Sequence, residues 1–181
     1  MARRPAVWVA SSSHHVAEAK AIQLELADDC DCKVWDQGTT PGEYLLADLM
    51  ERAKESDFGI FVLAADDLLV QRRTLTYVTR DNVIFELGLF MGTIGTDRCF
   101  LIVPSDREVD LPRDLGGLTP LRYRSDDRDR LRDALRPACE SIARAIAVKG
   151  LRAQISVDLW RGIGDDAALI AALSGNEMVK P

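Results

Sequence analysis

The chain has 181 residues and a formal net charge of −6, and 47% of its residues are apolar. This length fits one domain of roughly 100–200 residues, and the apolar content excludes a chain that is disordered throughout. The acidic balance argues against nucleic acid as a partner, and no apolar run reaches the roughly 18 residues that a membrane-spanning helix needs.

Short apolar runs alternate with amphipathic stretches along the chain. In chain order they predict a strand at Ala6–Ala10, a helix at Val16–Asp28, a strand at Lys33–Trp35, a helix at Pro41–Lys54, a strand at Phe58–Ala64, a helix at Asn82–Gly92, strands at Phe100–Val103 and Thr119–Arg122, and a helix at Arg128–Val148. Strands separated by helices indicate βαβ units. We therefore expect an α/β fold with a flavodoxin-like open parallel sheet of about five strands and helices on both faces.

The domain is expected to span residues 1–149, with residues 150–181 as a C-terminal extension that is not an independent domain. In such a sheet the ligand crevice lies beyond the carboxyl ends of the strands. The first ten residues contain no apolar run of signal-peptide length, so we expect a cytoplasmic protein without a membrane partner.

The cysteines Cys30, Cys32, Cys99 and Cys139 do not follow a metal-binding pattern. The one-residue spacing of Cys30 and Cys32 is wrong for a zinc knuckle, and His14 and His15 are the histidines that would have to complete a site. We expect free thiols in a reducing compartment and no bound metal.

The segment with the clearest chemical signal runs from Asn82 to Thr96, where Glu86 is the sole charged residue. A helix that is apolar nearly all round is expected to be buried, and a carboxylate in it is costly unless it is paired or functional. Asn82 and Glu86 are four residues apart and so share a helix face. The simpler alternative is that Glu86 forms an ion pair with a nearby arginine such as Arg80.

Gly88 and Gly92 are also four residues apart in this predicted helix. Each lowers helix stability by roughly 1 kcal/mol relative to alanine, which suggests that something approaches the helix closely. Packing against another backbone is the simpler explanation, and approach of a ligand is the alternative.

The run Arg80-Asp81-Asn82-Val83-Ile84-Phe85-Glu86-Leu87-Gly88-Leu89-Phe90-Met91-Gly92 resembles the signature of TIR-like domains in bacterial antiphage effectors. Such domains are fused to STING in CBASS systems and to cyclic-nucleotide sensors in Pycsar systems. Weaker similarity continues, in the same order, at Trp35–Gly38, Ala65–Leu68 and Leu111–Thr119, so the resemblance covers about residues 5–148. One departure is Thr79, where the family typically has proline, and we expect it to loosen the entry to the helix.

The resemblance implies the TIR fold and cleavage of NAD at the nicotinamide–ribose bond, with Glu86 as the catalytic residue. NAD is then the substrate, and no further cofactor is implied. The chemistry suits a carboxylate, because departure of nicotinamide leaves an oxocarbenium-like ribose whose positive charge a nearby anion stabilises.

Several other residues are candidate substrate contacts at the expected crevice. Ser11, Ser12 and Ser13 follow the first strand and could hold a phosphate, although one serine could simply cap the next helix. Trp35 could stack on a base, fill an intersubunit pocket or be plain core, and Asp36 opens a loop that gates the site in TIR domains. Asp66, Arg80 and Asn82 complete the set, with helix capping, solvation or ion pairing as their simpler roles.

Three classes of function remain open from the sequence. The first is an NAD-cleaving effector, by hydrolysis or cyclisation, which the resemblance implies is activated by homo-oligomerisation under a cyclic-nucleotide sensor domain or partner. The second is a nucleoside deoxyribosyltransferase-like enzyme, which uses a similar fold and a ribose-facing carboxylate. The third is a non-enzymatic TIR adaptor, which would not require an acidic residue at position 86.

Overall fold

A computed structural model describes residues 3–36, 45–71, 74–115, 117–126 and 128–153 of the chain. The chain divides into two units, Met1–Leu151 and Arg152–Pro181, and the first contains all the helices and strands that the structure describes. The division expected from the sequence, at residue 149, stays a prediction.

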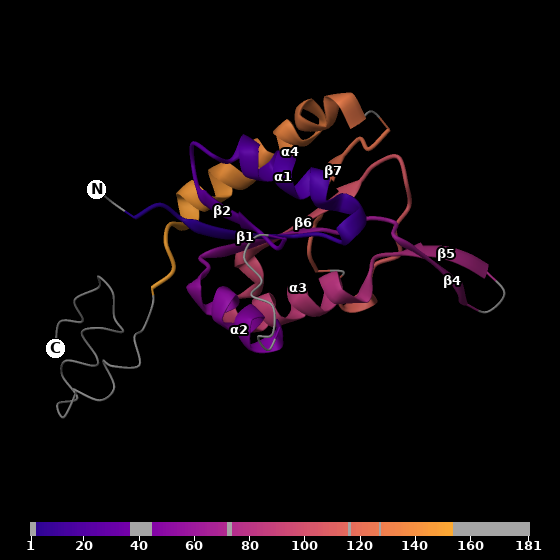
Figure 1. The fold of residues 1–181 in the computed structure, drawn as a ribbon, viewed down its shortest axis with the longest axis horizontal. Helices are drawn as coiled ribbons and strands as arrows, with labels where there is room; N and C mark the ends of the chain where they lie inside the picture. Colours follow the sequence, from indigo (N-terminus) through magenta and orange to yellow (C-terminus); the bar gives the residue numbers. More distant parts are fainter. Residues whose placement is uncertain (1–2, 37–44, 72–73, 116, 127, 154–181) are drawn as a thin grey trace. The chain divides into compact units, whose positions relative to one another are not determined.

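A parallel five-stranded sheet in the order β2-β1-β3-β6-β7 forms the centre of this unit. Its strands are β1 (Ala6–Ala10), β2 (Asp31–Val34), β3 (Phe58–Val62), β6 (Cys99–Pro104) and β7 (Leu121–Tyr123). The central strand β3 is buried along its whole length, as expected for a parallel strand covered on both faces. The open α/β sheet predicted from the sequence is therefore confirmed (Figure 1).

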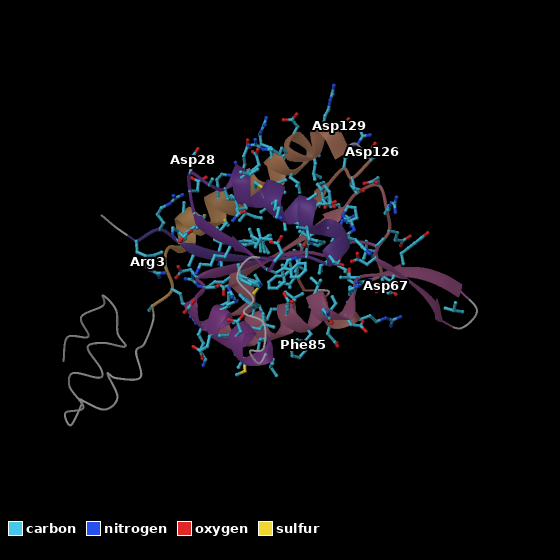
Figure 2. The ribbon with its side chains drawn as sticks, in the orientation of Figure 1. Arg3, Asp28, Asp67, Phe85, Asp126 and Asp129 are labelled. Atoms are coloured by element: carbon cyan, nitrogen blue, oxygen red, sulfur yellow. The ribbon has the colours of Figure 1, made fainter. Side chains whose placement is uncertain are left out.

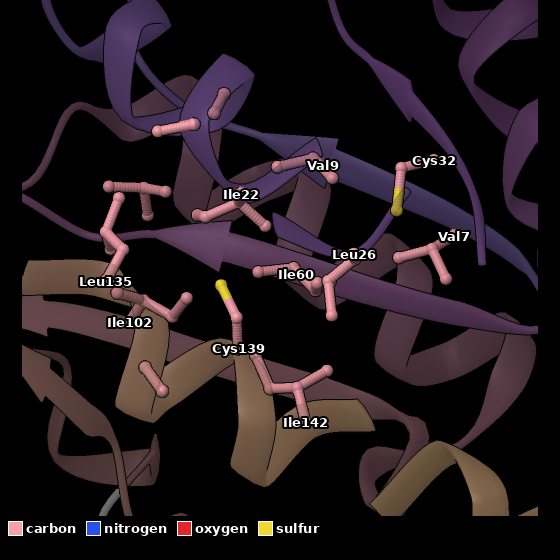
Figure 3. Close-up of a cluster of buried hydrophobic side chains, with 14 of the residues drawn as sticks. Val7, Val9, Ile22, Leu26, Cys32, Ile60, Ile102, Leu135, Cys139 and Ile142 are labelled. Atoms are coloured by element: carbon pink, nitrogen blue, oxygen red, sulfur yellow. The ribbon is translucent and has the colours of Figure 1, made fainter. Parts of the chain in front are cut away.

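One face of the sheet packs against α1 (Val16–Glu25) and α4 (Leu131–Lys149) (Figure 1). Figure 3 shows this layer, in which Ile22 and Leu26 meet Cys139 and Ile142 above the strand side chains. Helix α1 ends three residues before the predicted Asp28, since Leu26 already serves as its C-cap. Cys30, Cys32, Cys99 and Cys139 are all free and buried.

The opposite face packs against α2 (Leu45–Glu55) and α3 (Asp81–Ile94). Alternation along β1 sends Val7 and Val9 to the first face and Trp8 to this one. Gly59 in β3 makes room for this layer, because a Cβ there would lie 2.7 Å from Cε2 of Phe61. Helix α2 was predicted from Pro41, and residues 41–44 lie outside the described residues.

A second, two-stranded antiparallel sheet follows β3 and was not predicted from the sequence. It consists of β4 (Asp67–Gln71) and β5 (Thr74–Val78) and projects from the main sheet (Figure 1). A bridge from Val78 to Asp110 ties its base to the loop after β6. Short 3-10 turns complete the unit: η1 (Ser13–His15), η2 (Thr96–Arg98), η3 (Arg113–Leu115) and η4 (Arg128–Arg130). Within the described ranges, no helix combines the length and the apolar character needed to cross a membrane.

Candidate active site

A pocket of about 260 Å³ lies between β1, the end of β2 and the helices α2 and α3. Its lining residues are Trp8, Trp35, Leu46, Asp48, Leu49, Arg52, Asn82, Phe85 and Glu86. Its volume is near the lower end of the roughly 300–1,000 Å³ typical of small-molecule sites. Aromatic and aliphatic walls with a few polar groups are the usual composition of such a site.

Glu86 reaches this pocket from the second turn of α3. The helix places Val83, Leu87 and Phe90 against the sheet, and Glu86 is half-buried beside that face. Burial raises the pKa of Glu86 to about 7, and the nearby indole N–H of Trp8 opposes this rise. No described residue forms an ion pair with Glu86; Arg80, the expected partner, instead lies 3.4 Å from Asp67. An ion pair with a described arginine therefore does not explain the presence of Glu86 in this helix.

Trp8 forms one wall of the pocket and is 4% exposed. Its ring stacks on Phe90, with centroids 6.2 Å apart, and the Arg52 guanidinium lies 5.2 Å from its centroid. Its indole nitrogen approaches Glu86 without the geometry of a formed hydrogen bond, and among the described residues this buried N–H has no acceptor. An unsatisfied buried donor costs about 1–3 kcal/mol, so a native structure normally leaves one only for a reason.

Helix α2 contributes the opposite wall. Arg52 Nε donates a 2.8 Å hydrogen bond to Oδ2 of Asp48, one turn earlier on the same helix. The pair lies beside Leu49, which joins the apolar layer on this face of the sheet. The pocket therefore carries an internally compensated ion pair on one side and the Glu86 carboxylate on the other.

Trp35 lies just after β2, packs against the core and lines the pocket. Its indole N–H donates a 3.0 Å hydrogen bond to Oγ of Ser11. Ser11 is buried, and its own hydroxyl donates to the carbonyl of Ser12 at 3.1 Å. Ser11 does not line the pocket itself. Its hydroxyl oxygen accepts the hydrogen bond that fixes the orientation of the Trp35 indole, which does.

Ser12 and Asp66 form a separate polar cluster beyond the ends of β1 and β3. The Ser12 hydroxyl donates to Oδ1 of Asp66 at 2.5 Å, and no serine caps η1 or α1 with its side chain. His14 and His15 each place a ring nitrogen 3.6 Å from the same oxygen. The Asp66 side chain is fully buried, and its other oxygen has no partner among the described residues.

The remaining predicted contacts lie apart from the pocket. Asp36 pairs with Lys20 at 2.8 Å, Arg80 pairs with Asp67, and Ser13 is exposed at the start of η1. Asn82, in contrast, lines the pocket with Glu86, as expected from their spacing. Residues 37–41 of the loop that was expected to gate the site lie outside the described residues.

Thr79 and the glycines of α3 differ from expectation. Rather than loosening the helix entry, the buried Thr79 hydroxyl donates to the carbonyl of Ala64 at 3.1 Å, which ties the entry to the end of β3. Gly88 and Gly92 are exposed, and a Cβ on either would have no described neighbour within 4 Å. Close packing against the described residues therefore does not explain them. Helix α3 was expected to be buried nearly all round, but only one of its faces is buried. On another face Phe85 is 57% exposed (Figure 2).

The pocket residues that the sequence did not reveal are Trp8, Leu46, Asp48, Leu49, Arg52 and Phe85. A partial signal existed for Trp8, because period-2 alternation places it opposite Val7 and Val9. Asp48 and Arg52 have the spacing of a helical ion pair. Neither signal predicts that β1 and α2 both line the pocket that contains Glu86.

The arrangement offers a half-buried carboxyl group in a pocket with aromatic walls. A carboxylate in such a place stabilises positive charge more strongly than one in bulk water does. In the described part of the chain, no group of three or more His, Cys, Asp or Glu residues is arranged to hold a metal ion.

Comparison with known proteins places the chain among similar sequences. Residues 6–125 match the family described as CAP12/Pycsar effector protein, TIR domain. The chain is 40% identical to the Pycsar effector protein PaPycTIR of Pseudomonas aeruginosa over 139 residues, which is 75% of this chain and 45% of that protein. It is 37% identical to the Pycsar effector protein XpPycTIR of Xanthomonas perforans over 151 residues, covering 82% and 50%.

A third relative is the CD-NTase-associated protein 12 of Lachnospiraceae bacterium strain RUG226. It is 38% identical over 118 residues, which is 65% of this chain and 37% of that protein. The chain thus spans half or less of the length of these curated relatives.

Proposed function

The chain belongs to the family of CAP12/Pycsar effector TIR domains, and from this premise we propose that it is an NAD glycohydrolase that cleaves the nicotinamide–ribose bond. Glu86 is its catalytic residue. The observation that carries the proposal is the half-buried Glu86 carboxylate, which forms no ion pair with a described residue, in an aromatic pocket.

The proposed reaction breaks the bond between ribose C1′ and the nicotinamide nitrogen, and the bonding electrons leave with neutral nicotinamide. The ribose is left with an oxocarbenium-like charge, which Glu86 stabilises from one side. Water then adds to C1′ and loses a proton, giving ADP-ribose. In cyclisation an internal nucleophile takes the place of water, and the role of Glu86 is the same.

The perturbed pKa of Glu86 fits this role. A pKa of about 7 means that the empty pocket holds a carboxyl that is partly protonated near neutral pH. Bound NAD brings a positively charged nicotinamide ring, and an opposite charge nearby favours the ionised carboxylate. Binding of NAD therefore favours the ionised form of Glu86, which is the form that stabilises the positive charge of the transition state. Glu86 also accepts hydrogen bonds from ribose hydroxyls and so orients the sugar.

The pocket walls suit the flat nicotinamide end of the substrate. Trp35 and Phe85 offer aromatic surface in the same pocket as Asn82 and Glu86. A pocket of about 260 Å³ takes one end of a dinucleotide, so the pyrophosphate and adenosine extend outside it. The buried free thiols favour a reducing compartment, and we place the activity in the cytoplasm.

The names of the relatives supply the biological context of the proposal. Two are called Pycsar effector proteins and a third a CD-NTase-associated protein. We propose that this chain is likewise a toxic effector of bacterial antiphage immunity that depletes NAD. Activation by homo-oligomerisation under a cyclic-nucleotide sensor domain or partner is part of this proposal.

Product analysis tests the proposal against its alternatives. The purified chain is incubated with NAD and, separately, with a deoxynucleoside and a free base, and the products are separated by chromatography. Free nicotinamide with ADP-ribose or its cyclic form supports the proposal. Base exchange on the deoxynucleoside supports a deoxyribosyltransferase, and no turnover of either substrate at any protein concentration supports an adaptor.

A further inference from the structure

We propose that Trp8 is a positioning residue for Glu86: once the carboxyl ionises, the indole N–H of Trp8 donates to one carboxylate oxygen, so that the other faces the substrate. The inference rests on the proposed function for the identity of that substrate. Its geometric part concerns Trp8 and Glu86 alone and can be tested without NAD.

Contacts from two helices fix the orientation of the Trp8 ring. Phe90 of α3 stacks on it with centroids 6.2 Å apart and an interplanar angle of 19°, and Arg52 of α2 lies 5.2 Å from its centroid. The ring is 4% exposed and is rooted in β1. A ring held in this way cannot swing its N–H, so the direction of the donor is set before any substrate arrives.

The buried N–H belongs to a ring that lines the pocket. Among the described residues it has no hydrogen-bond partner, whereas buried indole N–H groups usually find one. Glu86 lies in the same pocket, and the N–H of Trp8 lowers its pKa. Glu86 and Phe90 are four residues apart on α3, so the ring that stacks on Phe90 lies within one helical turn of the carboxylate.

The remaining charges around the pocket do not compete for this role. Among the described residues that line it, the charged ones besides Glu86 are Asp48 and Arg52 of α2, and they pair with each other at 2.8 Å. An indole nitrogen is a donor only, so it interacts favourably with the ionised carboxylate and favours that form. A carboxylate with one oxygen engaged has less freedom to rotate, which presents the second oxygen to the sugar in a constant direction.

Nuclear magnetic resonance on the intact chain tests the pair directly. The indole 15N–1H resonance of Trp8, assigned by comparison with Trp8→Phe, is followed from pH 5 to pH 9 in the wild type and in Glu86→Gln. We expect its shift to titrate with a midpoint near that of Glu86 in the wild type and to be flat in Glu86→Gln. A Trp8 resonance that ignores the ionisation of Glu86 would overturn the proposal.

A pair of matched variants supplies the second readout. Trp8→Phe keeps an aromatic ring but removes the N–H, whereas Trp35→Phe removes an N–H that donates to Ser11. We expect the pKa of Glu86, measured from its carboxyl 13C shift, to rise in Trp8→Phe and to stay unchanged in Trp35→Phe. Equal values in the two variants would contradict the proposal. If Trp8→Phe does not fold, the wild-type titration decides alone, with the Trp8 resonance assigned through its nuclear Overhauser contacts to the Phe90 ring.

Kinetics adds the consequence for catalysis. Misplacing a catalytic group lowers the rate by on the order of tenfold to a hundredfold, so Trp8→Phe is expected to lower kcat more than it raises KM, with the acidic limb of its pH profile moved to higher pH. An unaltered kcat and pH profile would overturn the positioning role. A wild-type chain that cleaves no NAD would instead overturn the proposed function, and the titrations above would still decide whether Trp8 holds Glu86.

Discussion

The indole nitrogen of Trp35 lies 3.0 Å from Oγ of Ser11, to which it donates a hydrogen bond. Trp35 follows β2 and Ser11 follows β1, so the bond joins the ends of two neighbouring parallel strands at the pocket. Through this bond Ser11, which does not line the pocket, supports Trp35, which does.

This bond predicts the effect of Ser11→Ala. The substitution leaves the Trp35 N–H without its acceptor, so the ring loses its fixed orientation and substrate binding weakens. We expect KM for NAD to rise several-fold while kcat changes little, with stability lower by about 1 kcal/mol. Steady-state kinetics and thermal melting measure both quantities. Ser141→Ala, on α4 on the other face of the sheet, is the matched control, and an equal KM in the two variants would refute the bond's role.

The raised pKa of Glu86 predicts a pH-dependent gain of stability in Glu86→Gln. Between the ordinary value of 4.5 and about 7, the native state keeps a proton that the unfolded state releases, so stability falls as pH rises through this window. Glutamine is neutral throughout and escapes this loss. We expect equal melting temperatures near pH 4 and a more stable variant above pH 7, by at most on the order of 3 kcal/mol. A variant that is less stable than the wild type at pH 8 would contradict the burial of an unpaired carboxylate.

The glycines of the sheet and of α3 predict opposite effects of substitution. Gly59→Ala places a Cβ 2.7 Å from Phe61, and overpacking of this kind costs about 1–3 kcal/mol. Gly88→Ala meets no described neighbour within 4 Å, so helix propensity alone predicts a gain of up to about 1 kcal/mol. Denaturant unfolding of both variants measures the two changes. A loss of stability in Gly88→Ala at low protein concentration would show that the glycine is needed within one chain.

Dependence of activity on assembly is a separate prediction. We expect specific activity to rise with protein concentration, because mass action favours an assembled state. The exposed face of α3, with Phe85, Gly88 and Gly92, offers room for a neighbouring subunit, so Gly88→Ala is expected to weaken this rise while raising stability. Activity assays over a wide concentration range, with light scattering, measure the effect. Constant specific activity from a monomer would show that one chain completes the site.

The centre of the parallel sheet could be read from the sequence because β1, β3 and β6 are short apolar runs, whereas β2 and β7 at its edges include charged residues. The hairpin β4–β5 could not, for a physical reason. The residues between its two strands in the sequence are Arg72 and Arg73. The glycine or asparagine that normally marks a tight hairpin turn is therefore missing there. The alternation of Thr74, Thr76 and Val78 with Leu75 and Tyr77 was the available signal.

The site was predictable where it depends on local spacing and not where it depends on packing. Asn82 and Glu86 share a helix face by their spacing alone, and the structure places both in the pocket. Trp8 and Arg52 meet Glu86 only because α2 and α3 pack side by side on one face of the sheet. Ser12 and Asp66 were expected at the same crevice, but the Ser12 hydroxyl donates to Asp66 and the two residues form a cluster of their own.

The most direct test of the account is NAD cleavage by Glu86→Gln, measured as release of free nicotinamide by a variant verified to be folded, beside the wild type at the same concentration. Removing one electrostatic stabiliser of a transition state typically costs on the order of 10²–10³ in rate. We predict a loss of at least this size with the fold intact. Wild-type turnover in the folded variant would contradict the central claim that the Glu86 carboxylate carries the chemistry.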